Sequence, residues 1–298
     1  MSLLRRALVA NAVFSATTGT LAVAAPGQVA GWLGAVAPTE ITMIGLQLLA
    51  FAGVVGWVAR RPRPAPAPVL IISAADLLWV GGTFVLLLFW PALFSPLGTA
   101  LMLGVAGLVA CFAAGQLAGL ARQYRHPDPS SPHSHRVCLE FRAEATPAAM
   151  WQVVADLGAI DRFSPGLADA RLLDGARPSL GAVRQCTDTA GQRWTETCTA
   201  WKPGEGFSVR FDAAAPDFPF PFTSMSGRWA LSPTAGGTTV RVSWDLTPKP
   251  RRGGGLLVAA MAGSVARGMA RVVAAMAAEA RGEAAAAVTR RRPAATVC

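Results

Sequence analysis

Three side chains on two neighbouring predicted strands could together bind or orient a polar group. Arg184 lies on the first strand, and Trp194 and Glu196 share one face of the second. The Ala190-Gly191 turn joins the two strands, which brings Arg184 within reach of Glu196. We expect these three side chains to orient the polar head of a ligand. The alternative is a solvated cross-strand ion pair, which would contribute little free energy.

Apolar side chains on the same predicted elements could line a ligand cavity. Residues two apart on a strand share a face, so alternation assigns one apolar face to each strand. The residues assigned in this way are Phe207, Phe211, Met225, Trp229 and Trp244 on strands, and Met261 and Val265 on the C-terminal helix. Such a stripe is also typical of an ordinary core, and the two interpretations coincide where a core is partly hollow.

Signs of catalysis or of metal binding are few in this sequence. All three histidines lie in or beside a Pro-rich stretch, so no Ser/His/Asp arrangement is visible. Glu196 is the best candidate for an acid or a base, although its spacing demands no second group. His126, His133 and His135 with Cys138 match no closed zinc pattern. We therefore expect no metal and no cofactor.

Asp76 is the one carboxylate inside a predicted membrane span. A carboxyl group in this position is costly unless it is protonated or paired, which makes Asp76 a candidate functional residue. Asn11, Gln47 and Gln116 on other spans are its potential hydrogen-bond partners. The alternative is structural, because Asp76 lies about two helical turns from the predicted cytoplasmic end and could be solvated or hold the bundle together.

Four long apolar runs in residues 1–125 predict an all-α four-helix transmembrane bundle. The spans are residues 7–25, 41–59, 69–90 and 98–120, each near or above the roughly 20 residues that cross a bilayer. Arginines flank the start of the first span, the connection after the second and the end of the fourth, whereas the other two connections contain no Lys or Arg. By the positive-inside rule, both termini are cytoplasmic. A cleavable signal peptide is an alternative for the first span, and it would leave the other orientations unchanged.

The composition is typical of a bacterial cytoplasmic membrane protein. Hydrophobic residues make up 52% of the chain and charged residues 15%, and Arg far outnumbers Lys, as in proteins of GC-rich bacterial genomes. The net charge of +10 is spread over both halves without a basic stripe, so we expect no nucleic acid partner. The five cysteines show no CxxC and no close framework, which predicts free thiols in a reducing compartment.

Residues 137–282 predict an α+β domain. Alternation and turn signals indicate strands near 137–143, 168–174, 181–188, 192–201, 206–212, 222–231 and 238–247, with two short helices after the first strand. One long amphipathic helix follows over 254–282. Residues 126–136 contain three prolines and three serines and predict a flexible linker. Residues 283–298 predict a disordered tail.

Several short motifs mark this second half. They are Thr146-Pro147, Trp151, Asp156, Phe163-Ser164-Pro165-Gly166, Gly181, Trp201 with Pro203-Gly204, Phe207, Trp229, Leu231 and Gly237-Thr238. With them, residues 137–282 resemble the START-related helix-grip superfamily (SRPBCC), in particular its polyketide cyclase/dehydrase and lipid-transport family. The resemblance implies a curved antiparallel sheet closed by a long helix around a cavity. Because the superfamily uses this cavity for different ligands and reactions, the resemblance indicates fold more strongly than function. The membrane half is similar only in general to small four-span bundles such as the DoxX-like type.

We expect the chain to be a membrane anchor that carries a cytoplasmic binding domain for a hydrophobic small molecule, such as a lipid, a quinone or a polyketide-like compound. Two alternatives stay open: a polyketide cyclase or dehydratase that uses the same cavity, and a membrane-tethered module for a protein partner of unknown identity. Residues 215–222 contain three Pro and three Phe and cannot form a central strand. They could form a lip over the cavity, a contact with the lipid bilayer, or a packed surface loop.

Overall fold

The computed structural model describes residues 1–283 and 296–298, which form two compact units. The first unit is Met1–Gln123, whose regular elements are helices, and the second is Tyr124–Cys298, which contains the β-sheet. The boundary falls where the apolar helices end and the mixed-charge sequence begins, because each unit buries its own core.

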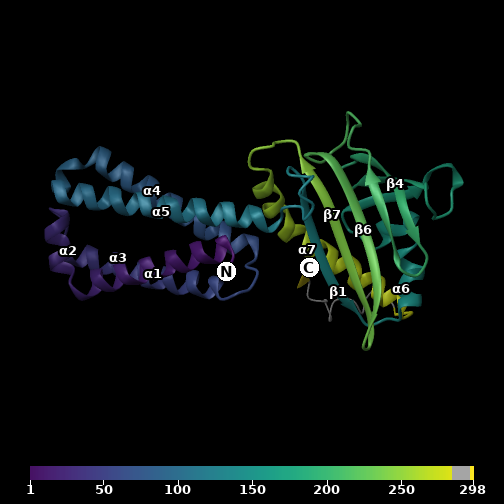
Figure 1. Ribbon diagram of the computed structural model, residues 1–298, viewed down its shortest axis with the longest axis horizontal. Helices are drawn as coiled ribbons and strands as arrows, with labels where there is room; N and C mark the ends of the chain where they lie inside the picture. The colour runs from purple at the N-terminus through teal and green to yellow at the C-terminus, as the bar shows by residue number, and fades with distance from the viewer. Residues whose placement is uncertain (284–295) are drawn as a thin grey trace. The chain divides into compact units, whose positions relative to one another are not determined.

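Five α-helices build the first unit, and Figure 1 shows how they are arranged. They are α1 (Leu3–Ala24), α2 (Pro26–Leu33), α3 (Pro38–Ala59), α4 (Pro66–Phe89) and α5 (Pro96–Gln123), with the 3-10 turn η1 (Pro91–Leu93) before α5. Helices α2 to α5 each begin at a proline, whose fixed φ and missing N–H suit the first turn of a helix. Helix α2 lies in a segment that we expected to be a plain connection.

Helices α1, α3, α4 and α5 are long and apolar enough to cross a membrane. Helix α7 (Gly254–Ala280) of the second unit meets the same criterion of length and composition, but it packs against the sheet. The start of α1, the connection from α3 to α4 and the end of α5 lie at one end of the first unit (Figure 1). The arginines that flank the spans therefore gather at that end.

Small residues let the helices of the first unit approach closely. A Cβ atom on Gly19 of α1 would lie 2.8 Å from the carbonyl oxygen of Gly45 in α3. A Cβ atom on Gly119 of α5 would lie 2.5 Å from the backbone nitrogen of Leu4 in α1. Real Cβ atoms do not come so close, so larger residues here would push the helices apart.

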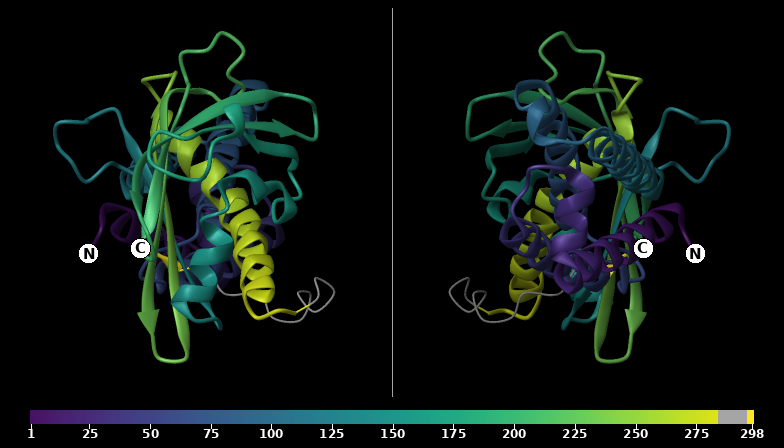
Figure 2. Two further views of the ribbon diagram at one scale, coloured as in Figure 1. Left: turned by 90° about the vertical axis from the view of Figure 1, so that its right-hand side faces the viewer. Right: turned by 90° about the vertical axis from the view of Figure 1, so that its left-hand side faces the viewer.

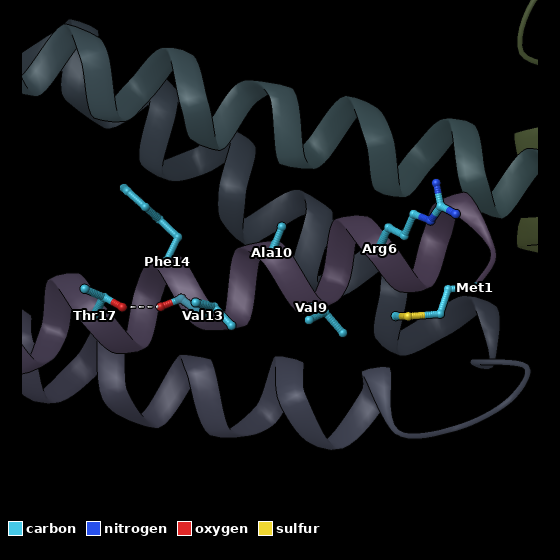
Figure 3. Close-up of a pocket in the computed structure, with 7 residues that line it drawn as sticks. All are labelled: Met1, Arg6, Val9, Ala10, Val13, Phe14 and Thr17. Atoms are coloured by element: carbon cyan, nitrogen blue, oxygen red, sulfur yellow. Dashed lines mark hydrogen bonds between the residues drawn. The ribbon is translucent and has the colours of Figure 1, made fainter.

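A broad apolar hollow lies on the outer surface of α1 (Figure 3). Its volume is about 580 Å³, and it is lined by Met1, Arg6, Val9, Ala10, Val13, Phe14 and Thr17. The Thr17 hydroxyl donates to the carbonyl oxygen of Val13 at 2.9 Å, which satisfies the one hydroxyl in the lining. Apart from Arg6, the hollow presents hydrocarbon, as suits a surface that lipid acyl chains cover.

One antiparallel sheet and one long helix dominate the second unit (Figures 1 and 2). The strands are β1 (His135–Ala143), β2 (Leu167–Leu172), β3 (Val183–Asp188), β4 (Arg193–Lys202), β5 (Gly206–Phe211), β6 (Phe222–Thr234), β7 (Gly237–Pro248) and β8 (Thr296–Val297). Their order in the sheet is β2-β3-β4-β5-β6-β7-β1-β8. The short helices α6 (Pro147–Val154), η2 (Leu157–Arg162) and η3 (Leu173–Gly175) lie between β1 and β3 along the chain. This arrangement confirms the predicted helix-grip fold.

Helix α7 lies across one face of the curved sheet (Figure 2). It contacts β1 and β7 and also meets α6. The face that α7 buries carries Val258, Ala262, Val273 and Met276. The alanine and the two valines are small enough to allow close packing. The core of this unit therefore sits between the sheet and α7.

The predicted flexible linker, residues 126–136, is attached to the sheet. The N–H of Arg136 donates to the carbonyl oxygen of Tyr124 at 2.7 Å, and its guanidinium pairs with Asp245 on β7. His126 lies 3.3 Å from the same carboxylate. This segment is therefore a hydrogen-bonded turn that leads into β1, because side-chain contacts offset the flexibility that its composition suggests.

The expectation of free thiols is wrong for two of the five cysteines. Cys138 on β1 and Cys298 form a disulfide, and β8 pairs with β1 beside it. Cys111, Cys186 and Cys198 are free. Of the predicted disordered tail, residues 284–295 lie outside the described residues, whereas Thr296–Val297 belong to the sheet.

Candidate functional site

Strand register places the predicted strand residues of the site on one face of the sheet. Residues that pair directly across antiparallel strands point to the same side. The direct pairs are Arg184 with Glu196, Cys186 with Trp194, Glu196 with Phe211, and Phe207 with Trp229. Gly227 of β6 pairs with Val209 on one side and with Trp244 on the other, so these two residues share the same face. Met225 lies two residues before Gly227 and therefore points the same way. Trp244 also pairs with the buried Val137 of β1, a strand that α7 contacts. The predicted residues therefore line the inner face of the sheet.

A buried polar cluster lies on β3 and β4. A terminal nitrogen of Arg184, Nη2, donates to Oε2 of Glu196, while the indole Nε1 of Trp194 donates to Oε1 of Glu196 at 2.8 Å. Arg184 also donates from Nη1 to the carbonyl oxygen of Leu157 at 2.9 Å, so η2 covers it. Arg184 is 8% exposed and Glu196 is 4% exposed, which excludes the alternative of a solvated ion pair.

The environment of the cluster shifts the pKa values of Arg184 and Cys186. Burial is the largest single influence on Arg184 and lowers its pKa, but the charges and hydrogen bonds of Glu196 and Cys186 together outweigh burial, so the pKa of Arg184 lies above its usual value. Burial, followed by the Glu196 charge, raises the pKa of Cys186 to about 12. Nε of Arg184 is buried and has no hydrogen-bond partner among the residues that the structure describes. A buried donor of this kind is costly unless a ligand or water satisfies it.

A row of aromatic rings runs from α6 across β4 and β5 to β6. Trp151 of α6 packs on Trp201 with ring centroids 5.1 Å apart, Trp201 stacks on Phe207 at 6.0 Å, and Phe207 stacks on Trp229 at 6.2 Å. Alternation along the strands identified Phe207 and Trp229. It missed Trp151 and Trp201, which the sequence marked only as family motifs.

Several inner-face side chains keep part of their surface accessible. Phe207 and Trp229 are buried, whereas Phe211, Met225 and Trp244 are only half-buried although their strands lie inside the domain. Met261 and Val265 of α7 are half-buried as well, but the fully buried positions in this half of the helix are Val258, Ala259 and Ala262, so only the three strand residues bear on the inner face. Part of the surface of Phe211, Met225 and Trp244 is therefore left uncovered by the protein, and an apolar ligand would find contacts there.

The Pro- and Phe-rich segment 215–222 folds over the polar cluster. The ring of Phe220 meets Trp194 edge-on at 5.1 Å and Phe211 at 6.4 Å, and Phe218 lies 5.3 Å from Phe220. The segment ends where β6 begins at Phe222. Its aromatic side chains thus face the cluster, as a lip would.

A second hollow, which the sequence did not predict, lies near the end of α7. Its volume is about 410 Å³, and Gln152, Asp156, Arg162, Phe163 and Glu279 belong to its lining. Arg162 donates to Glu279 at 2.7 Å across it. Asp156 and Phe163 were visible only as family motifs, so no pattern in the sequence pointed to a hollow here.

Asp76 of the first unit is buried and hydrogen-bonded. The side-chain amides of Asn11 and Gln116 donate to its Oδ2 at 2.8 and 3.0 Å, so two of the three partners considered from the sequence are present. Asp76 is 3% exposed, which excludes solvation in this structure. Helix α4 begins at Pro66, so Asp76 lies about 15 Å along it, deeper than two turns.

Comparison with known proteins adds a family for the second half. The family described as "Polyketide cyclase / dehydrase and lipid transport" matches residues 134–280. No curated protein matches the chain at a significant level. Similar solved structures include Ara h 8.0201, 14% identical over 50% of this chain and 99% of that one, with a TM-score of 0.42.

Two enzymes are among the other similar structures. Norcoclaurine synthase from Thalictrum flavum is 14% identical over 47% of this chain and 84% of that one, with a TM-score of 0.37. The di-domain ARO/CYC StfQ from the steffimycin biosynthetic pathway is 12% identical over 61% of each chain, with a TM-score of 0.41. Such low identities and TM-scores carry no argument about ligand or reaction.

Proposed function

We propose, from the premise that residues 134–280 form a polyketide cyclase/dehydrase and lipid transport domain, that this protein binds a hydrophobic small molecule beside a membrane. The ligand lies between the sheet and α7, and its polar group lies at Arg184, Trp194 and Glu196. One observation carries the proposal: a buried ion pair faces an otherwise apolar inner surface that remains partly accessible.

The polar cluster supports a binding role more than an acid or base role. Both oxygens of Glu196 already accept hydrogen bonds, one from Arg184 and one from Trp194. Glu196 is therefore engaged by its neighbours in the cluster and is not turned toward a substrate. It fixes Arg184 in position, and the unpartnered Nε–H is the group that a ligand oxygen, directly or through water, would satisfy.

Apolar side chains supply the affinity in this proposal. Burial of apolar area contributes about 25 cal/mol per Å², so a ligand that covers Phe211, Met225 and Trp244 gains mainly from them. Lipid, quinone and polyketide-like molecules all combine an apolar body with one or a few oxygens. They dissolve in the bilayer, where tethering by α1, α3, α4 and α5 would raise the local concentration of the domain.

The proposed location is a bacterial inner membrane, with both termini in the cytoplasm. It rests on the arginines gathered at one end of the helical unit, near Arg5, Arg60 and Arg122, because short positively charged connections stay cytoplasmic. The second unit follows α5 directly and would lie on the same side.

Native mass spectrometry of the full-length protein, extracted in mild detergent, tests the binding role. We expect a small apolar molecule in stoichiometric amount that is released on denaturation. The double variant Arg184→Met/Glu196→Leu leaves no unpaired buried charge, so it should retain the fold. It should lose most of this molecule, because the polar cluster is gone.

The double variant Arg241→Met/Glu140→Leu is the matched control. Glu140 pairs with Arg241 across β1 and β7 on the opposite face of the sheet, so this change removes a similar ion pair away from the proposed site. It should leave the bound molecule in place. A protein that carries no apolar molecule, and that takes none up from membrane lipid extract, would refute the proposal.

A further inference from the structure

Helices α1, α3, α4 and α5 surround a cavity at Asp76. Its volume is about 180 Å³. Asn11 and Phe14 line it from α1, Gln47 and Phe51 from α3, and Asp76 and Trp79 from α4. A cavity of about 150 Å³ in another protein accepts benzene, so this one has room for a single six-membered ring with a short substituent.

In the hydrogen-bond network around Asp76, every chain of donors ends at the Asp76 carboxyl group. The hydroxyl of Ser15 donates to Oδ1 of Asn11 at 3.1 Å, and that of Ser73 donates to Oε1 of Gln116 at 2.8 Å. Each amide therefore has its oxygen occupied and its NH₂ group turned to Asp76. Two amide donors on one oxygen favour the ionised form of a carboxyl group, whereas burial opposes that form, so a cation beside Asp76 would stabilise the charge.

This carboxylate lacks a counter-charge. No Lys, Arg or His among the described residues lies within ion-pair distance of Asp76. Both hydrogen bonds end on Oδ2, and Oδ1 accepts none from the part of the chain that the structure describes. An unpaired charge near the middle of a bilayer is costly, so a cation at Oδ1 would relieve a large penalty.

The rest of the cavity suits an organic cation that reaches it from the lipid. Phe14, Phe51 and Trp79 are aromatic, and aromatic faces attract cations in dry surroundings. Trp79 is 37% exposed, and Gln47 and Ala75 are exposed as well, so the cavity opens on the outer surface of the helical unit. In a membrane, that surface faces acyl chains.

We propose that this cavity binds a small ring-bearing amine in its protonated form, with the ammonium group on Oδ1 of Asp76 and the ring among Phe14, Phe51 and Trp79. This site is separate from the proposed ligand site of the sheet domain, and it makes the helical unit a binding unit as well as an anchor.

Binding of 4-fluorobenzylamine to the full-length protein in lipid nanodiscs tests the proposal by fluorine NMR. We expect saturable binding that benzylamine displaces. Benzyl alcohol, a neutral hydrogen-bond donor, and ethylbenzene, an apolar molecule of the same shape, should displace it at least about tenfold less well. Equal displacement by the three would show that charge is not recognised and would overturn the proposal.

Three variants locate the site. Asp76→Asn should weaken binding at least about tenfold, because it removes the charge. Ala75→Phe should also abolish binding, because the ring fills the opening of the cavity while the hydrogen bonds of Asp76 stay intact. This variant tests the site even if Asp76→Asn fails to fold. Leu78→Phe adds the same ring on α4 at a side chain that is 77% exposed and outside the cavity lining, and it should bind as the parent does. Full binding by a folded Ala75→Phe variant would refute this location.

Discussion

Arg184 and Glu196 form a buried ion pair between β3 and β4, whereas Arg241 and Glu140 form the same kind of cross-strand pair in the open on the other face of the sheet. One fold thus contains an Arg–Glu pair in two environments. Desolvation should make their energetic roles very different, although their geometry is alike.

Removal of one partner from the buried pair should be strongly destabilising. Arg184→Met leaves Glu196 as an uncompensated buried charge, and we expect a loss of about 3–5 kcal/mol in the free energy of unfolding. Arg241→Met should cost less than about 1 kcal/mol, because its partner stays solvated. Thermal unfolding of the full-length protein in detergent compares the two. The double variant Arg184→Met/Glu196→Leu should recover much of the loss, and equal losses at both single sites would contradict the assignment of a buried pair.

Cys186 should make stability depend on alkaline pH. Burial and the Glu196 charge raise its pKa to about 12 from an ordinary 9.0. The folded protein keeps this proton where the unfolded chain releases it, so the contribution is complete below about pH 9 and declines as pH rises toward 12. Thermal unfolding as a function of pH should show this decline, and Cys186→Ala should reduce it. An unchanged alkaline profile in Cys186→Ala would count against the buried thiol.

Alkylation gives a second measurement of the same thiol. At pH 8 a buried thiol with so high a pKa carries almost no thiolate, so native Cys186 should react with a maleimide far more slowly than the same residue in denaturant. Mass spectrometry of the digested protein follows the reaction. Rapid labelling of native Cys186 would mean that the cluster is open to solvent.

Phe220→Ala should speed the release of the bound molecule. The ring of Phe220 covers Trp194 and Phe211, and its loss uncovers the polar cluster. We expect faster exchange of ligand in a chase experiment followed by native mass spectrometry, with little change in stability. Leu180→Ala is the control, because Leu180 is 66% exposed and the substitution removes only a surface side chain of the same domain. Identical exchange rates in both variants would contradict the role of a lip.

The redox state of Cys138 and Cys298 in cells tests which compartment holds the sheet domain. Disulfides persist in oxidising compartments and are rare in the cytoplasm. If the sheet domain is cytoplasmic as proposed, both thiols should be reduced when cells are quenched with acid and alkylated, and the bond should form after purification in air. A pair that is already oxidised in the quenched cells would place this domain on the other side of the membrane.

Period-two alternation was sufficient to predict the inner face of the sheet. Phe207 and Trp229 lie where this pattern places them, and Arg184 meets Glu196 because a short turn fixes the register of β3 and β4. The burial of that pair could not be predicted, since it depends on a carbonyl of η2, Leu157, which lies 27 residues before Arg184.

The helical pattern of α7 was less informative. A stripe through Met261 and Val265 was expected to face the sheet, but in this half of the helix the buried positions are Val258, Ala259 and Ala262. Alanines occupy almost every side of α7, so the spacing of the larger residues did not fix its orientation.

Contacts between segments that are far apart in the sequence could not be predicted either. The disulfide joins residues 160 positions apart, and a last-residue cysteine carries no signal of its partner. Trp151 and Trp201 lie on different elements, so only the fold brings their rings together.

The pairing of Thr296–Val297 with Leu139 and Glu140 occupies part of the sheet's outer edge at β1. An uncovered edge strand offers its N–H and C=O groups to any other extended chain, and a second copy of the same protein is the nearest such chain at a crowded membrane. Thr296 and Val297 cover part of this edge, and this pairing should oppose edge-to-edge association there. Their removal would turn β1 into a template for aggregation.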